Sequence, residues 1–321
     1  MKIDLVYNPT AGTGTEIAEI LELLAEAGHR VRHRSSKGKW RDLLQDSGKL
    51  LVAAGGDGTV RKVALAAAET GRPFAILPLG TANNVAKSLE IVGTTREVID
   101  RWSADEDGVA FDIGEARASW GRTRFIESVG GGLFAELLAR EGEIGVGHEL
   151  VGREMDQALH VLGEELEVAR PARWRIEVDG RDVSGEYLAV EILNIRFAGP
   201  NVILDRDATP TDGLFDVVTI GEADRAELAR YLEDRLHLAS GHIPRHTVRR
   251  GSEIRLVPPR SARLRADDRL WPRKPIDAPS WIRVTCRPGA ARLVGVSGRS
   301  REMRPAPPRT DARPALALPT R

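Results

Sequence analysis

The sequence predicts an α/β part built on a parallel, doubly wound sheet, followed by a mainly antiparallel β part. As far as about residue 110, short apolar runs typical of buried strands alternate with runs of helical periodicity. Three loops rich in Gly, Asn and Thr follow strands in this part, at residues 8–14, 55–59 and 78–84. From Phe111 onwards the pattern changes to short strands separated by turn signals. We therefore expect one domain over residues 1–110 and a second over residues 111–289.

The first domain opens with a strand at residues 3–7 and a helix that Thr15 caps and Gly28 ends. The apolar face of this helix is formed by Ile17, Ile20, Leu21, Leu24 and Ala25. Further strands are predicted at residues 29–34, 50–54 and 74–77, and a short helix is predicted from Val85. In such sheets ligands bind outside the carboxyl ends of the strands, which is where the three loops fall.

The second domain contains strand-like runs with period-two patterning. They lie at residues 173–178, 186–195, 215–220, 254–257, 262–266 and 281–285, with a hairpin turn at Asp179-Gly180. Helical segments are predicted near residues 133–140, 149–168 and 224–238. The segment at 149–168 has two interpretations, a helix packed on the sheet or a lid that faces lipid. Residues 300–321 are expected to form a flexible tail.

Composition excludes several classes of protein. The chain has 321 residues, a formal net charge of +0 and one cysteine, Cys286. A neutral chain is not expected to have nucleic acid as its main partner, and one cysteine allows neither an internal disulfide nor a thiolate metal cluster. This cysteine usage fits a reducing cytoplasm. No apolar stretch approaches the ~20 residues of a membrane span, so a lipid substrate would have to be met at the inner face of the membrane.

The run Gly55-Gly56-Asp57-Gly58-Thr59 indicates a phosphate site. It follows the apolar residues 50–54 and precedes a helix at residues 60–68, so its glycine amides and the helix N-terminus can face an anion. Asp57 would repel phosphates unless Mg²⁺ lies between them or the carboxylate handles a proton. The alternative is a structural turn in which Asp57 caps the helix.

Three motifs in the first domain resemble those of the diacylglycerol kinase-like lipid kinases, which include soluble bacterial diacylglycerol kinases, sphingosine kinases and ceramide kinases. They are Asn8-Pro9-x-x-Gly12, Gly55-Gly56-Asp57-Gly58-Thr59 and Pro78-Leu79-Gly80-Thr81-Ala82-Asn83-Asn84-x-Ala86. Further similar motifs are Gly130-Gly131-Gly132-Leu133-Phe134-Ala135, Asp212-Gly213-Leu214-Phe215-Asp216-Val217 and Pro288-Gly289-Ala290-Ala291-Arg292-Leu293. The resemblance covers about residues 3–296.

The resemblance implies an ATP-binding α/β domain, a β-sandwich-like domain and an active site in the cleft between them, with the chain returning to the first domain near residues 290–300. It places ATP among Asn8, Gly12, Gly56, Gly58, Thr59, Gly80, Thr81 and Asn83, with Ser36 reaching the ribose or base. Asp57 would bind Mg²⁺ or orient the reacting hydroxyl. No Walker-type Gly-x-x-x-x-Gly-Lys-Ser/Thr motif is present in the sequence.

Asp212 and Asp216 form a second carboxylate pair. The resemblance implies that they hold a structural Mg²⁺, in keeping with the oxygen ligands of a hard cation. The alternative is that Asp212-Gly213 is only the turn that opens a strand.

Three positions depart from the family pattern. Where the family carries Asp-Gly-Glu, with the glutamate as general base, this chain has Asp267-Asp268-Arg269. An arginine cannot act as a base at working pH. Three possibilities follow: Asp268 is the general base, Asp57 alone is sufficient, or phosphoryl transfer to a hydroxyl is impaired. Asn83-Asn84 stands where many members have Asn-Asp. Residues 204–207 replace a proline-containing segment expected near the acceptor.

We expect an ATP- and Mg²⁺-dependent kinase that phosphorylates a hydroxyl of a lipid or lipid-like alcohol, of the diacylglycerol type first. The alternatives are a kinase of a soluble small alcohol and a catalytically weak nucleotide- or lipid-binding regulator. The sequence does not decide whether the protein forms a homodimer. It also does not decide whether the arginine-rich tail binds an anionic membrane or is simply solvated.

Overall fold

The computed structural model describes residues 1–11, 16–45, 48–104, 107–144, 153–237, 242–260, 262–272 and 280–296. Gly12, Thr15 and the tail at 300–321 lie outside these ranges, so the structure says nothing of the expectations placed on them. Among the described residues, no helix is both long enough and apolar enough to cross a membrane.

The first domain is a mixed α/β domain with a parallel sheet, as the sequence predicts. Four strands are hydrogen-bonded in the order β4, β3, β1 and β2, every neighbouring pair parallel. Their bounds are Lys2–Tyr7 for β1, Arg30–Ser35 for β2, Leu50–Gly55 for β3 and Pro73–Pro78 for β4. All six residues of β3 are buried, which explains why this strand is a continuous apolar run instead of an alternating one.

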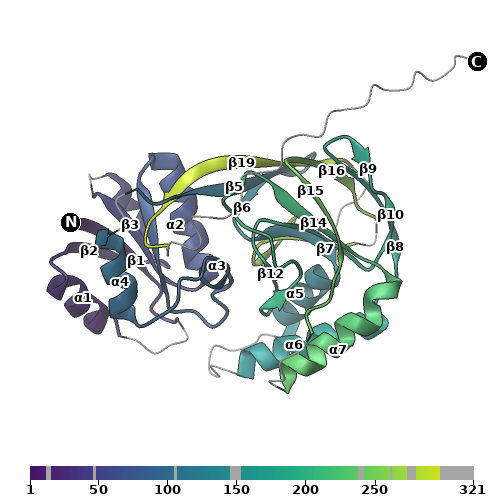
Figure 1. The fold of residues 1–321 in the computed structure, drawn as a ribbon, viewed down its shortest axis with the longest axis horizontal. Helices are drawn as coiled ribbons and strands as arrows, with labels where there is room; N and C mark the ends of the chain where they lie inside the picture. The colour runs from purple at the N-terminus through teal and green to yellow at the C-terminus, as the bar shows by residue number, and fades with distance from the viewer. Residues whose placement is uncertain are drawn as a thin grey trace, which may run out of the picture.

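Helices cover both faces of this sheet (Figure 1). Helix α1 packs beside α4 on one face, and α2 lies against β3, β4 and β19 on the other. The elements are α1 (Ile17–Glu26), α2 (Asp57–Thr70), the short α3 (Asn84–Ser88), α4 (Thr95–Ala104) and a 3₁₀ helix (Trp40–Gln45). Helix α1 has no side-chain cap at Glu16 and depends on burying Ile20 and Leu24.

A single long strand, β19 (Ile282–Leu293), joins the two domains. It pairs antiparallel with β16 (Glu253–Val257) and with β5 (Val109–Ala118), then parallel with β4 of the first domain. The sequence predicts a strand only at residues 281–285, before Pro288-Gly289. In the structure these residues instead form a bulge between Arg287 and Ala291, and the strand continues beyond it.

The second domain is an antiparallel β-sandwich-like domain. A six-stranded sheet in the order β15-β14-β11-β7-β17-β18 packs against the part of the large sheet formed by β8, β16, β19 and β5. The core between the sheets includes Trp174, Phe125 and Phe215, with the two phenylalanine ring centroids 5.4 Å apart. The strands of the smaller sheet are β7 (Ser128–Gly132), β11 (Ala189–Leu193), β14 (Phe215–Ile220), β15 (Thr247–Gly251), β17 (Leu264–Ala266) and β18 (Arg269–Leu270).

Three helices cover the outer face of the six-stranded sheet, at the lower right of Figure 1. They are α5 (Leu133–Ile144), α6 (Arg153–Val168) and α7 (Arg225–Leu236), the last preceded by a 3₁₀ turn at Glu222–Asp224. Leu159 and Leu162 of α6 are buried in this layer. Helix α6 therefore packs on the sheet layer, the first of the two interpretations of the predicted 149–168 segment.

One predicted strand, at residues 186–195, is wrong. The chain forms β10 (Gly185–Tyr187) in the large sheet and β11 in the smaller one, and it changes sheets at the buried Leu188. No turn residue marks the point where the chain changes sheets, so strand propensity alone predicts one continuous strand. The other strands are β6 (Gly121–Phe125), β8 (Ala172–Val178), β9 (Arg181–Asp182), β12 (Phe197–Ala198) and β13 (Val202–Ile203).

Candidate active site

The first-domain loops meet at the carboxyl edge of the parallel sheet. Gly80, after β4, approaches Gly56, after β3, so closely that a Cβ on Gly80 would lie 2.3 Å from the Gly56 Cα. A Cβ on Gly55 would similarly lie 3.1 Å from the Cβ of Asn8, which follows β1. Only residues without side chains allow this packing of backbone on backbone. The glycine-rich turn and the Pro78–Asn84 turn thus form one surface at the start of α2.

Asp57 occupies the first turn of α2, where Gly56 is the N-cap residue. Its carboxylate does not cap α2. Instead its two oxygens accept the backbone N–H groups of Asn84 and Val85, each at 3.0 Å, at the beginning of α3. Burial raises the pKa of Asp57 despite these hydrogen bonds. Asp57 therefore has a structural contact that the sequence does not reveal, and a cation beside it would relieve a charge that burial disfavours.

Asn83 folds back on its own loop. Its amide nitrogen donates to the Gly80 carbonyl at 2.6 Å and its carbonyl oxygen accepts the Gly80 N–H at 2.9 Å, with the backbone at φ 50°. Both side-chain groups are thus used within the turn. Thr59 is buried under Gly55, while Thr81 is exposed at the mouth of the cleft.

Two lysines that the sequence reasoning did not single out lie at the outer side of these loops. Lys62 of α2 donates to the carbonyl of the buried Ser36 at 3.0 Å. Lys37 donates to the Thr10 hydroxyl at 2.8 Å, and Thr10 in turn is bound to the side chain of Asn8. The signal for Lys62 is its position one helical turn beyond Gly58 on a helix that begins at a phosphate-type turn.

A cavity of about 250 Å³ lies between the two domains. Its polar end is formed by Asp57, Thr81 and Asn84 from the first domain and by Glu127, Arg265, Asp267 and Asp268 from the second. Its apolar wall is formed by Phe134, Leu137, Leu138, Met155, Ala158 and Pro200. A cavity with these two ends suits a molecule that has a polar head and an apolar chain.

Asp267 and Asp268 form the turn between β17 and β18, and they have different surroundings. Asp267 is buried and accepts backbone N–H groups of Ile126, Glu127 and Ser128 at 2.8 to 3.3 Å. Burial raises its pKa to about 6. Asp268 has a side chain that is 55% exposed, and its Oδ2 would be 3.1 Å from a Cβ on Gly58. The structure thus brings the carboxylate of Asp268 over the glycine-rich turn.

Arginines surround this pair of carboxylates. Arg61 of α2 lies 3.6 Å from Asp267 and 3.8 Å from Asp268, and Arg269 lies 3.8 Å from Asp268. The residue at the position of the family's glutamate is therefore a cation that pairs with its own neighbour.

Glu127 is the cavity residue that sequence reasoning missed. It is buried at the start of β7, and its Oε2 accepts the side-chain amide of Asn84 at 3.3 Å. Burial, followed by the negative charges of Asp57 and Asp267, raises the pKa of Glu127 well above its usual range. The available signal is a single acidic residue close to the apolar residues Phe125, Ile126 and Val129.

Asp212 and Asp216 are brought together away from this cavity. The guanidinium of Arg250 contacts both, with its Nε 3.1 Å from Asp216 Oδ1. Burial and the charge of Asp205 raise the pKa of Asp216 to about 7, and its Oδ2 has no hydrogen-bond partner. Among the described residues no group of three or more acidic, His or Cys side chains is arranged to hold a metal. The unpartnered buried oxygen is nevertheless of the type that a hard cation binds.

Asp112 ties two of the second-domain motifs together. Its carboxylate accepts the Gly213 N–H at 2.6 Å and the Gly289 N–H at 2.7 Å. Asp205, in the segment expected near the acceptor, instead lies beside Asp216, and residues 204–207 do not line the cavity. The closeness of residues 204–207 to the acceptor therefore stays a prediction.

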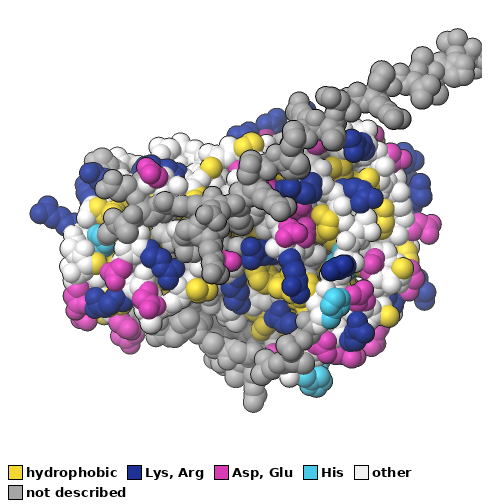
Figure 2. Space-filling model, in the orientation of Figure 1, with side chains coloured by type: hydrophobic (Ala, Val, Ile, Leu, Met, Phe, Trp, Pro, Cys, Tyr) yellow, Lys and Arg dark blue, Asp and Glu magenta, His cyan; other side chains and the backbone are white. Residues whose placement is uncertain are grey.

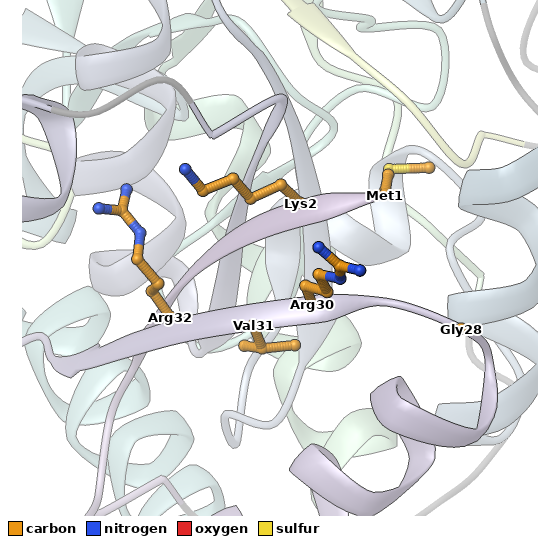
Figure 3. A pocket seen from close by; sticks show the side chains of 6 residues that line it. All are labelled: Met1, Lys2, Gly28, Arg30, Val31 and Arg32. Carbon is orange, nitrogen blue, oxygen red and sulfur yellow. The ribbon is translucent and has the colours of Figure 1, made fainter.

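A larger cavity of about 440 Å³ lies at the opposite end of the parallel sheet (Figure 3). It lies at the amino ends of β1 and β2, and its lining residues are Met1, Lys2, Gly28, Arg30, Val31 and Arg32. None of these side chains is acidic, and the glycine-rich loops are at the other edge. Over the face shown in Figure 2, basic and acidic side chains are interspersed, in keeping with the zero formal charge.

Comparison with known families agrees with this geometry. Residues 2–116 match the family profile described as "Diacylglycerol kinase catalytic domain", and residues 153–295 match "YegS C-terminal NAD kinase beta sandwich-like domain". The chain belongs to the diacylglycerol kinase and YegS-like lipid kinase family. The two matched segments correspond to the two domains on either side of the acidic cavity.

Relatives within this family are similar over most of their length. The chain is 29% identical over 263 residues to a "Diacylglycerol kinase" of Bacillus subtilis (strain 168), covering 74% of this chain and 81% of that protein. It is 29% identical over 231 residues to a "Probable lipid kinase YegS-like" of Pseudomonas aeruginosa, covering 67% of this chain and 71% of that protein. A crystal structure of a diacylglycerol kinase from Bacillus anthracis shares the fold, with a TM-score of 0.65, 18% identity and coverage of 91% and 96% of the two chains.

Proposed function

We propose that this lipid kinase family member transfers the γ-phosphoryl group of Mg-ATP to a hydroxyl of a lipid or lipid-like alcohol, with a diacylglycerol as the first acceptor to test. The observation that carries the proposal is the cavity between the domains, which is lined by both acidic and apolar side chains. Its polar end contains Asp57 of the glycine-rich turn, and its wall is made of apolar side chains of α5 and α6. A lipid head group at the polar end would meet the phosphate-binding turn while its chain contacts the apolar wall.

The nucleotide would bind on the first domain. Backbone N–H groups around Gly56 and Gly58, together with the start of the fourteen-residue helix α2, can face its phosphates. Lys37 and Lys62 add positive charge beside Asn8 and Ser36. Mg²⁺ would neutralise phosphate charge, and the carboxylate of Asp57 is the donor on this edge that fits it. What the chain supplies is therefore mostly position and charge compensation, which in-line phosphoryl transfer requires.

The test is transfer of labelled phosphate from Mg-ATP to a panel of diacylglycerol, monoacylglycerol, sphingoid and prenol acceptors in mixed micelles. We expect product with at least one lipid, and loss of that product in Asp57→Ala. Leu137→Asp, which places a charge in the apolar wall, should raise the KM for lipid and leave the KM for ATP unchanged. Transfer to glycerol alone would show a kinase of soluble alcohols instead.

One observation favours a second function, that of a nucleotide- or lipid-binding regulator with little turnover. Arg269 is a cation 3.8 Å from Asp268, at the position where the family resemblance places a glutamate base. A regulator would bind ATP by calorimetry without forming product, and Arg269→Glu would then increase transfer. A kinase that works with Arg269 in place would gain nothing from this change.

A further inference from the structure

The carboxyl groups at the polar end of the cavity differ in what already binds them. Both oxygens of Asp57 accept backbone N–H groups of α3. Asp267 accepts three backbone N–H groups and lies 3.6 Å from Arg61. Asp268 is largely exposed and lies within 3.8 Å of two arginines. The oxygens of each of these carboxylates are therefore already engaged by hydrogen bonds, by cations or by water.

Glu127 has fewer partners in the part of the chain that the structure describes: the charge of Arg265 acts on it without a direct ion pair, and Asn84 donates one hydrogen bond to it. Among the described residues it has no ion-pair partner, and the one hydrogen bond that its carboxyl makes is to the neutral amide of Asn84. The same amide nitrogen also donates to the Gly199 carbonyl at 3.1 Å, so Asn84 has a fixed orientation between α3 and the second domain. A buried carboxyl that lines a cavity and has only one amide partner can accept a further hydrogen bond from a ligand.

The position of Glu127 also suits an acceptor hydroxyl. Glu127 immediately precedes β7, and α5, which carries Phe134 and Leu137 of the apolar wall, begins directly after that strand. Asn84, its partner, donates its backbone N–H to the carboxylate of Asp57. The carboxyl of Glu127 is thus separated from the glycine-rich turn by a single amide residue and faces the same cavity as the apolar wall.

We propose that Glu127 is the catalytic residue that binds the acceptor hydroxyl and takes its proton, an inference that rests on the proposed kinase function. In this step the O–H bond of the acceptor breaks while its oxygen forms a bond to the γ-phosphorus of ATP. The bond between that phosphorus and the β,γ-bridging oxygen breaks, and its electron pair leaves with ADP. The proton is transferred to the Glu127 carboxylate and from there to solvent.

Two features of the site support this assignment over Asp268. Glu127 lines the cavity and its carboxyl has one amide partner, so it has an acceptor position left for the hydroxyl of a bound alcohol. The side chain of Asp268 is 55% exposed and lies within 3.8 Å of two guanidinium groups, so water and these cations compete with an acceptor hydroxyl for its oxygens. Glu127 also explains how a chain with Arg269 at the expected glutamate position can keep a base in the cavity.

The test compares the full-length wild type with Glu127→Gln, Asp268→Asn and Glu136→Gln. Glutamine keeps the size of Glu127 and can still accept the Asn84 amide, so the fold should be retained. Glu136 is the matched control, since it lies on the side of α5 away from the cavity, 3.0 Å from Arg263. Transfer from Mg-ATP to dioctanoylglycerol gives kcat and the KM for ATP. Binding of dioctanoylglycerol and of its 3-deoxy analogue, measured by calorimetry without ATP, gives the preference for a hydroxyl.

We expect Glu127→Gln to lower kcat by ~10²–10⁴, with the KM for ATP within about twofold of wild type, and to abolish the hydroxyl preference. Asp268→Asn should lose less, and Glu136→Gln should behave as wild type. The proposal is overturned if Glu127→Gln keeps kcat within about threefold, if Asp268→Asn loses more, or if wild type shows no hydroxyl preference. A wild type that transfers no phosphate, but shows a hydroxyl preference that Glu127→Gln abolishes, would refute the kinase function and leave Glu127 as a hydroxyl-binding residue.

Discussion

Arg265 and Glu191 form a buried ion pair, with Arg265 Nη2 2.9 Å from Glu191 Oε2, and both side chains are at most 6% exposed. The same guanidinium donates to the Ser128 hydroxyl and to the Asp267 carbonyl, each at 2.8 Å. Arg265 thus links β11 and β7 to the turn that carries Asp267 and Asp268. Removal of one partner would leave the other as an uncompensated buried charge.

We therefore expect Arg265→Met to lower the free energy of unfolding by roughly 3–5 kcal/mol, and the double change Arg265→Met with Glu191→Leu to recover most of this loss. The exposed pair Arg283–Glu253 provides the control, and Arg283→Met should cost about 0–1 kcal/mol. Urea unfolding followed by circular dichroism measures all four proteins. If the double variant loses as much unfolding free energy as Arg265→Met alone, the ion pair contributes more to stability than the mutual compensation of two buried charges.

The contact between Gly80 and Gly56 predicts a steric effect at the nucleotide edge. Gly80→Ala places a Cβ 2.3 Å from the Gly56 Cα, so one of the two turns must move. We expect a loss of roughly 1–3 kcal/mol in unfolding free energy and at least tenfold weaker ATP binding by calorimetry. Gly163→Ala, in helix α6 with no atom near its added Cβ, should stabilise by up to about 1 kcal/mol. Unchanged ATP affinity in Gly80→Ala would argue against nucleotide binding at this edge.

Much of the fold could be predicted from the sequence because two kinds of signal are local. Apolar runs such as residues 50–54 mark the parallel strands, and Gly, Asn and Pro mark the loops at their ends. The change of sheet at Leu188 and the continuation of β19 through Pro288-Gly289 could not be predicted, since each depends on pairing with strands that are distant along the chain. Local propensity indicates where a strand is possible, and tertiary pairing decides where it ends.

The site was predicted unevenly for a related reason. Motif spacing located Asp57, Gly80 and Asp268, and the structure brings all three to one cleft. Glu127 and Arg265 carry no motif of their own, and their chemistry arises from burial beside groups that are 43 and 74 positions away in the chain. A sequence shows the residue types but not which carboxyl becomes buried beside a cavity with a single hydrogen-bond partner.

Asp57 has a structural contact as well as its proposed reaction role, and two substitutions separate these. Asp57→Ala removes the acceptor of two backbone N–H groups of α3 and should cost about 1–3 kcal/mol in stability. Asp57→Asn keeps one oxygen acceptor and should cost less. We expect both variants to lose at least 10²-fold in kcat, because an amide neither binds Mg²⁺ well nor carries the charge. Product formation by Asp57→Asn at the wild-type rate would assign Asp57 a structural role alone.

The carboxylate pair Asp212 and Asp216 predicts stabilisation by Mg²⁺ outside the cavity. The unpartnered Asp216 Oδ2 is available to a cation, so millimolar Mg²⁺ should raise the Tm of the wild type by a few degrees at pH 8. Asp216→Asn should reduce this shift, and Mg²⁺ should still bind with ATP at the other site. The measurement is differential scanning calorimetry with and without Mg²⁺. An equal shift in Asp216→Asn would show that Mg²⁺ stabilises the protein at a site other than this carboxylate pair.

The buried turn residue Asp267 predicts the sign of one pH dependence. Burial raises its pKa from 3.8 to about 6, while Arg61 and the N–H groups of Ile126 and Glu127 oppose that shift and the charge of Asp268 adds to it. The folded protein therefore holds a proton on Asp267 that the unfolded chain releases, and this contribution to stability is lost as pH rises from about 4 to about 6.

Asp267→Asn keeps an oxygen acceptor, suits the φ of 51° and does not titrate. The Tm of Asp267→Asn relative to wild type should thus rise between pH 4 and pH 7. Because the other titrating groups are common to both proteins, a relative Tm that falls over this range would mean that hydrogen bonds and Arg61 lower the pKa of Asp267 instead.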